Sequence, residues 1–157
     1  MYRLINSRKG FTLIEVLVVI GIIAILATVV LVAVNPGRQF KLARDSQRTS
    51  NVNAILNAIG QNMSEHHGVF TCIGVVRDMP TAPTFIKSSA IVGDPGDIAA
   101  CLVPDYLSAL PFDPSAVGAH FSSTTDYSTG YQFFRDANGR VTASSSGELT
   151  PTISVTR

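Results

Sequence analysis

The sequence predicts an α+β protein, in which a long N-terminal α-helical stalk carries a small antiparallel β-sheet head on its C-terminal half. Three features predict this class: an apolar run over residues 11–34, an amphipathic helical pattern in 35–67, and short β-type segments between turn residues in 68–157. Residues 1–10 form a basic leader. The chain of 157 residues has room for one membrane-spanning helix and one domain of about 100 residues, which can hold a modest core.

The apolar run over residues 11–34 contains a single charged residue, Glu15. A helix of roughly 20 apolar residues spans a bilayer. A carboxylate inside such a helix is costly when it meets lipid without a partner. We therefore expect Glu15 to have a partner, and the identity of that partner is the key to function.

Residues 9–16 read KGFTLIEV and follow a short basic segment. This pattern strongly resembles the class III signal of type IV pilins and type II secretion pseudopilins, which combines a basic leader, a glycine, a phenylalanine and a glutamate five residues into the mature chain. The resemblance implies that prepilin peptidase cuts between Gly10 and Phe11 and methylates the new amine of Phe11. The signal is specific, because these features and a long apolar run have to coincide.

The same resemblance implies a pilin fold and a single-pass precursor in the cytoplasmic membrane, with its N-terminus on the cytoplasmic side. The implied partners are identical or related pilin subunits, prepilin peptidase, a membrane assembly platform, and membrane lipid before assembly. The mature chain would then lie in an extracellular or periplasmic filament. We expect no cofactor.

The chemistry of Gly10 and Glu15 can be stated without the family. Gly10 has no side chain, so a protease can approach its backbone closely. Cleavage after Gly10 creates a positively charged amine, which can lie against Glu15 of another subunit in a filament. Such pairing offsets part of the desolvation of both charges. We expect Glu15 to fix the register of neighbouring subunits, as buried polar residues do in coiled coils.

Two other interpretations of the N-terminus share some of these features. A secretory signal peptide has an apolar core of about 7–15 residues, which is shorter than the run found here. A plain single-pass anchor would have the same topology as a pilin precursor. Basic residues flank both ends of the run, so their count alone does not choose an orientation.

The charge of the chain argues against generic nucleic-acid binding. The precursor has a formal net charge of +1, and the predicted head is mildly acidic. A basic stripe follows the apolar run at Arg38, Lys41, Arg44 and Arg48. It could meet lipid head groups or DNA, but a solvated helix face or juxtamembrane anchor is the more usual interpretation. No specific nucleic-acid partner is evident.

The stalk has an interruption and an end that the sequence predicts. Pro36 and Gly37 weaken the helix between its two segments, because proline lacks an amide donor and glycine has a low helix propensity. The stalk ends at His66 and His67. Two adjacent histidines point in different directions on a helix, so a metal site is disfavoured there. The apolar stripe of the second segment comprises Val52, Ile55, Leu56, Ile59 and Met63.

The head reads as a series of β-type segments. We expect a first strand over 69–76, a loop over 77–84, a turn within 88–96, and a short helix over 98–103 capped by Asp97. Residues 121–129 read as a surface loop. Residues 130–134 and 140–143 predict a hairpin, and 150–157 predict a loose tail or short edge strand.

The head contains both cysteines, Cys72 and Cys101. Either a disulfide or two buried free thiols fits this placement, and oxidising conditions outside the cytoplasm favour the disulfide.

The sequence has no recognisable nucleophile motif, phosphate-binding loop or metal-ligand cluster. Asp113, Asp126 and Asp136 lie in predicted loops, where solvated turn carboxylates are favoured over a calcium site.

Three functions remain open at this point. A type IV pilin would form long fibres, a type II secretion pseudopilin would form a short periplasmic filament, and a membrane-tethered enzyme or binding protein would stay monomeric. The position of Glu15 favours the first two. We therefore expect a structural subunit and not an enzyme.

Overall fold

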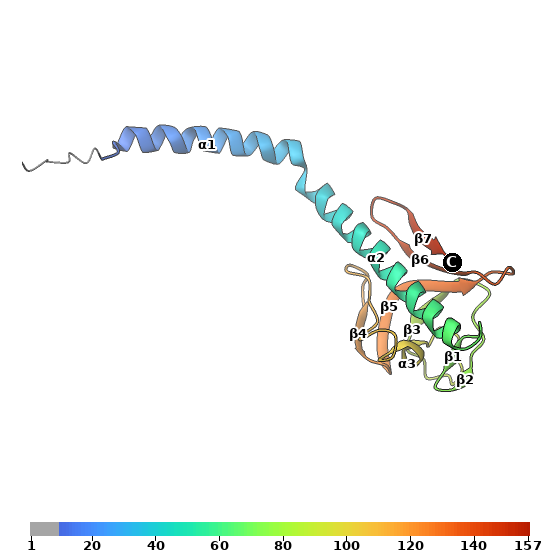
Figure 1. Ribbon diagram of the computed structural model, residues 1–157. Coiled ribbons are helices and arrows are strands. Elements are labelled where there is room, and N and C mark those ends of the chain that lie inside the picture. The colour runs from blue at the N-terminus through green and yellow to red at the C-terminus, as the bar shows by residue number, and fades with distance from the viewer. Residues whose placement is uncertain (1–9) are drawn as a thin grey trace, which may run out of the picture. The chain divides into compact units, whose positions relative to one another are not determined.

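The computed structural model describes residues 10–157, so the predicted leader lies outside the described residues except for Gly10. The chain divides into two compact units, the first reaching to Gln39 and the second running from Phe40 to Arg157. Helix α1 (Leu13–Val34) belongs to the first unit, and helix α2 (Pro36–Glu65) starts in the first and continues into the second. The remaining elements belong to the second unit (Figure 1): β1 (Thr71–Cys72), β2 (Val75–Val76), β3 (Thr84–Lys87), α3 (Ala99–Leu102), β4 (His120–Ser123), β5 (Asp126–Arg135), β6 (Val141–Ser146) and β7 (Thr152–Thr156).

The second unit is built around an antiparallel sheet that lies against α2 (Figure 1). Its strands follow the order β3-β5-β6-β7, and β4 pairs with the first residues of β5. The predicted hairpin is confirmed as β5 and β6, which pair from Gln132↔Ser144 to Arg135↔Val141. The structure therefore confirms the predicted α+β class and the pilin-like arrangement of a sheet on the C-terminal part of a helix.

The core lies between the apolar stripe of α2 and the inner face of the sheet. Alternate residues of β5 are buried, because successive strand side chains point to opposite faces. The predicted stripe on α2 is confirmed: four of its members are buried, and Met63 packs against the core as a half-buried residue. The main contributors are Val52, Ile55, Leu56 and Ile59 from α2 with Tyr127, Tyr131 and Phe133 from β5.

Two segment predictions in the head are wrong. Residues 69–76 do not form one strand but the hairpin β1–β2, because Ile73 and Gly74 have positive φ and reverse the chain. Residues 121–129 are not a surface loop, since most of them belong to β4 and β5 and pair with each other. Serine and threonine occur in strands as well as loops, so composition alone misled the second prediction.

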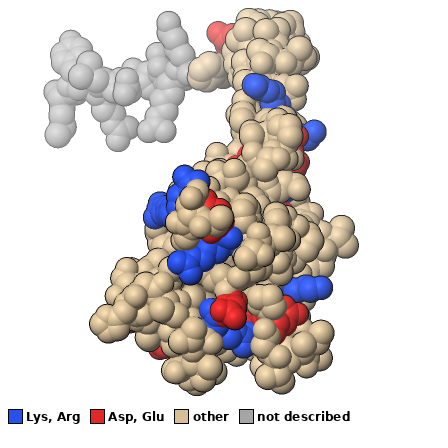
Figure 2. Space-filling view, turned by 90° about the vertical axis from the view of Figure 1, so that its right-hand side faces the viewer, with Lys and Arg blue, Asp and Glu red and all other residues tan. Residues whose placement is uncertain are grey.

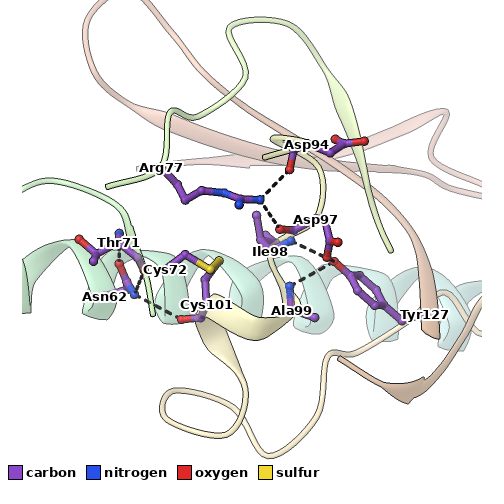
Figure 3. Close-up of a disulfide and its surroundings, with 10 residues drawn as sticks. All are labelled: Asn62, Thr71, Cys72, Arg77, Asp94, Asp97, Ile98, Ala99, Cys101 and Tyr127. Carbon is purple, nitrogen blue, oxygen red and sulfur yellow. Dashed lines mark hydrogen bonds between the residues drawn. A yellow bond between two sulfur atoms is a disulfide. The ribbon is translucent and has the colours of Figure 1, made fainter. Parts of the chain in front are cut away.

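The cap of the short helix α3 also differs from prediction. Asp97 does not cap it, and Ile98 occupies the N-cap position without a side-chain hydrogen bond. Instead, the buried Tyr127 hydroxyl accepts hydrogen bonds from the backbone N–H of Ile98 (2.9 Å) and Ala99 (3.1 Å), and donates to the Asp97 carboxylate (2.7 Å; Figure 3). A side chain from β5 thus performs the capping that a local residue was expected to perform.

A disulfide joins Cys72 of β1 to Cys101 of α3 (Figure 3). Beside it, the buried Asn62 side chain of α2 donates to the carbonyl oxygens of Thr71 (2.8 Å) and Cys101 (3.3 Å) and accepts from the Thr71 N–H (2.9 Å). The covalent bond and the amide together hold β1 and α3 against the end of α2.

The C-terminal segment forms an edge strand, the second of the two predicted alternatives. β7 pairs with β6 along its whole length, from Thr152↔Ser146 to Thr156↔Thr142. The Arg157 side chain then reaches α2, where its guanidinium donates to Asn53 and Asn57. The C-terminus is therefore fixed to both the sheet and the helix.

Candidate functional site

Helix α1 is an apolar surface with no cover of its own. All of its 22 residues, Leu13–Val34, are exposed in the described chain. By length and composition this helix could cross a membrane. Residues 13–34 include one charged residue, Glu15, whereas the face of the second unit shown in Figure 2 carries Lys, Arg, Asp and Glu side chains of both signs. Lipid or other apolar helices have to cover such an apolar surface, because its exposure to water is unfavourable.

Glu15 has a partner within its own chain that the sequence analysis missed. Its carboxylate accepts hydrogen bonds from the backbone N–H (2.8 Å) and the hydroxyl (2.7 Å) of Thr12. In return, the Thr12 hydroxyl accepts from the Glu15 N–H (3.3 Å), which completes a capping box at the start of α1. The Thr-x-x-Glu spacing is the sequence signature of this motif and could have revealed it.

The capping box supplies the Glu15 carboxylate with hydrogen-bond donors. It also supplies acceptors to some of the N–H groups at the start of the helix, four of which lack intrahelical partners. Its two donors are neutral, so the carboxylate keeps its full negative charge. A cation beside Glu15 would therefore add an interaction that residues 10–157 of the same chain do not supply.

Gly10 and Phe11 lie immediately before this cap and outside any helix or strand. Both residues are exposed, and Phe11 is 87% accessible. A Cβ at Gly10 would meet no atom within 4 Å. The bond between these two residues thus lies in an exposed part of the described chain, before the first helix.

Residues 5–31 match the family model described as the prokaryotic N-terminal methylation motif. The match covers Gly10, Phe11 and Glu15 together with most of α1.

The chain carries the N-terminal methylation motif typical of type IV pilins and pseudopilins.

Comparison of the chain with curated proteins and with solved structures gave no significant match. The similarity of this chain to pilins and pseudopilins therefore rests on the methylation motif and on the α+β fold described above. The motif and its apolar helix are consistent with a precursor in the inner membrane.

The interruption after the methylation motif falls at Asn35, one residue before the predicted position. Asn35 has φ 46° and ψ 78°, a left-handed conformation that ends α1. Its side-chain oxygen accepts from the Arg38 N–H (3.2 Å) at the start of the next helix. Pro36 is the first residue of α2, where a missing N–H costs nothing, and Gly37 follows it inside the helix.

Part of the basic stripe after the motif is buried, contrary to prediction. Arg48 is only 3% exposed, and its guanidinium donates to both carboxylate oxygens of Asp113 (2.7 and 3.0 Å) and to Asp45 (2.7 Å). Arg44 forms a bidentate pair with Glu148 (2.5 and 2.7 Å). Arg48 is engaged inside the head and the partly exposed Arg44 is paired at its surface, so these two arginines do not form a free binding face.

We call Asp45, Arg48, Asp113 and Glu148 the buried charge cluster, because the first three are buried and the partly exposed Glu148 joins them through Arg48. Asp45 also accepts the backbone N–H groups of three consecutive residues, 148–150, at 2.8 to 3.2 Å. Gly147 permits this approach, because a Cβ there would lie 2.1 Å from the Thr150 carbonyl oxygen. The cluster therefore ties α2 to two loops that are distant in sequence.

Electrostatics in the cluster follow from these contacts. Backbone N–H donors, that of Glu148 first, lower the pKa of Asp45, and hydrogen bonding to Arg44 lowers the pKa of Glu148 to about 2. Burial alone would raise the pKa of Asp113, but Arg48 and the N–H groups of the following loop outweigh it, so that pKa is also lowered. All three carboxylates are ionised at neutral pH.

The remaining predicted acids and histidines do not form a site. Asp136 is a turn carboxylate that accepts from the N–H groups of Asn138 and Arg140, and Asp126 lies 3.2 Å from His120. Asp113 is not a solvated turn residue, because Arg48 holds it in the core. Within residues 10–157, no group of three His, Cys, Asp or Glu side chains is placed to hold a metal ion.

Proposed function

We propose that this chain is a structural subunit of a type IV pilus-like filament. Prepilin peptidase would process it, and the membrane assembly platform would build it into the filament through α1. The observation that carries the proposal is the methylation motif on a helix whose apolar side chains are all exposed.

Processing is the first step. The peptide bond between Gly10 and Phe11 lies in an exposed, non-helical segment. Its hydrolysis leaves Phe11 as the new N-terminus, and transfer of a methyl group to that amine gives N-methylphenylalanine. A secondary amine of this kind still carries a positive charge at neutral pH.

Assembly is the second step. Before it, α1 lies in the cytoplasmic membrane, where lipid covers its side chains. Afterwards, the corresponding helices of neighbouring subunits cover them. The surrounding medium stays apolar in both states, so α1 can move from lipid to filament without exposure to water.

Glu15 then selects the alignment of the subunits. Its carboxylate keeps the neutral donors of Thr12 and gains the Phe11 amine of a neighbouring copy. An unpaired charge in an apolar filament core is costly, so a shift of one subunit along another would be disfavoured. Glu15 in this role acts chiefly on register, as single polar residues do in coiled coils.

The mass of the N-terminal peptide tests processing. Protein from a host with a working prepilin peptidase should begin at Phe11 with one added methyl group. A chain that retains Met1 would contradict the proposal and favour a simple membrane anchor. Gly10→Leu blocks close approach to the backbone and should leave the precursor uncut, whereas Ser7→Leu, outside the cut bond, is the matched control.

A second measurement distinguishes the filament systems. A pilin is recovered in long fibres sheared from the cell surface, whereas a secretion pseudopilin stays in the envelope as a short filament. Glu15→Leu should abolish either polymer and leave membrane insertion intact. If Glu15→Leu polymerises as well as the unchanged chain, the proposed register role is wrong.

A further inference from the structure

Two cations of the basic stripe, Arg38 and Lys41, take part in none of the ion pairs formed within residues 10–157. Both are exposed, and they lie three residues apart in α2, so their side chains leave the helix on the same side. No acidic residue occurs between Glu15 and Asp45, and Asp45 is buried in the head. The first turns of α2 therefore present a positive charge that no neighbouring carboxylate balances.

These cations follow closely on the end of the apolar helix. The 22 residues of α1 give a length of about 33 Å, which matches the hydrocarbon core of a bilayer. Lys41 comes seven residues after Val34, and the last five of these steps lie within α2. Chain connectivity alone therefore keeps the Lys41 Cα within about 15 Å of the end of α1. When α1 spans a bilayer, both long side chains can reach the head-group layer just outside the core.

Phe40 adds an apolar side chain to the same turns of α2. This residue is 64% exposed, so the described chain does not cover it. A helix turns by about 100° per residue, so Phe40 points away from the side that carries Arg38. Helices that lie in a membrane interface have this arrangement, with apolar side chains toward the acyl chains and cations toward the head groups.

We propose that residues 36–42 lie in the head-group layer of the leaflet in which α1 ends, where Arg38 and Lys41 bind the phosphates of anionic phospholipids. Phe40 then packs at the boundary of the acyl chains. The inference rests on the membrane-bound precursor of the proposed function. It gives that precursor a contact with lipid outside the apolar helix.

The page of contacts around these residues favours lipid over other anionic partners. A membrane-spanning α1 holds Arg38 and Lys41 beside phosphate groups, so no separate binding step is needed. Basic residues next to an anionic membrane surface each raise the affinity for it about fivefold. Two cations alone contribute little affinity for a free polyanion such as nucleic acid, whose binding depends on many phosphate contacts.

A matched pair of double variants tests the contact in the full chain. Arg38→Gln with Lys41→Gln removes both charges and keeps good helix formers on an exposed surface, so the unfolding temperature should not change. Lys87→Gln with Arg140→Gln removes the same charge from exposed side chains of the head and is the control. All the chains share the leader, so differences between them report on α2.

Electron paramagnetic resonance of spin-labelled lipids measures the preference of each chain for phosphatidylglycerol over phosphatidylcholine. In phosphatidylcholine bilayers at low salt, the unchanged chain and the control should prefer phosphatidylglycerol more strongly than the α2 variant does, by roughly two- to fivefold. Salt should reduce this difference, because it screens exposed charges. Equal preferences of the α2 variant and the control would overturn the proposal.

Crosslinking locates the contact. Phosphatidylglycerol with a diazirine in its head group should label residues 36–44 of the unchanged chain and should label the α2 variant much less. Labelling confined to the leader, or equal labelling of both chains, would contradict the contact. A chain that is cut after Gly10 but shows no lipid preference would lose this contact alone, whereas one that retains Met1 and shows the preference would lose only the proposed function.

Discussion

Removal of the Arg48 charge should destabilise the head strongly. Arg48→Met keeps much of the length and apolar volume of the side chain but removes the guanidinium that binds Asp113 and Asp45. Asp113, which is 5% exposed, would then be a buried carboxylate without a cation. Its remaining donors are two N–H groups of the following loop and neighbouring hydroxyls.

The size of the effect follows from the burial of both partners. Removing one member of a buried ion pair typically costs about 3–5 kcal/mol, because the other charge stays desolvated. For a folded unit of this size, that loss corresponds to a decrease of roughly 10–20 °C in unfolding temperature. The double variant Arg48→Met with Asp113→Leu removes both charges, so it should recover a large part of the loss.

Thermal unfolding of the detergent-solubilised full chain, followed by near-ultraviolet circular dichroism, measures these differences. Arg140→Met is the matched control, because the Arg140 side chain is exposed while it pairs with Asp136, so its removal should have little effect. An Arg48→Met variant that unfolds at the temperature of the unchanged chain would refute the assigned role of the buried charge cluster.

Three further predictions concern the head. Its free energy of unfolding should be nearly constant from pH 7 to about 5 and fall as the pH drops toward 2, because the carboxylates of the buried charge cluster have lowered pKa values and stabilise the fold only when ionised. Reduction of the disulfide, measured by denaturant titration, should cost roughly 3–4 kcal/mol in the chain-entropy model. Tyr127→Phe leaves the start of α3 uncapped in the core and should cost about 1–3 kcal/mol, measured in the same way.

Each of these has an outcome that would contradict it. Acid stability equal to neutral stability would mean that the carboxylates contribute no net interaction. If the free energy of unfolding stays the same after verified reduction of the disulfide, noncovalent contacts with α2 are enough to hold β1 and α3. Tyr106→Phe, whose exposed hydroxyl donates to Glu65, is the control for Tyr127→Phe, and equal effects of the two would exclude a special role for the cap.

The elements with a strong local pattern could be predicted from the sequence. The apolar run is recognised by its length, the stripe on α2 by its helical spacing, and the hairpin of β5 and β6 by β-type segments around a turn, so local patterning carries the information. The interruption near Pro36 was also predictable, but its position was not. Asn35 takes the left-handed conformation, and proline fits the first position of the next helix.

Interactions between distant parts of the chain could not be predicted in the same way. The Arg48–Asp113 pair spans 65 residues, and only the packing of α2 against the sheet brings the two together. Similarly, the hydroxyl that caps α3 comes from Tyr127, about 28 residues later in the chain. A single sequence does not reveal which charged or hydroxyl-bearing residues become neighbours.

At the N-terminus, the missed contact was a local one. The Thr12–Glu15 box follows directly from residue spacing, and it shows that the carboxylate has neutral donors even in a single chain. In a polymer, the Glu15 carboxylate can therefore be in one of two environments. Either it accepts hydrogen bonds only from Thr12, or it also pairs with a cation from a neighbouring subunit.

A filament structure at near-atomic resolution distinguishes these alternatives most directly. We expect the Glu15 carboxylate to lie within salt-bridge distance of the methylated Phe11 amine of an adjacent subunit. A carboxylate that contacts only its own Thr12 and otherwise faces apolar side chains would contradict the proposed role of this charge in aligning the subunits.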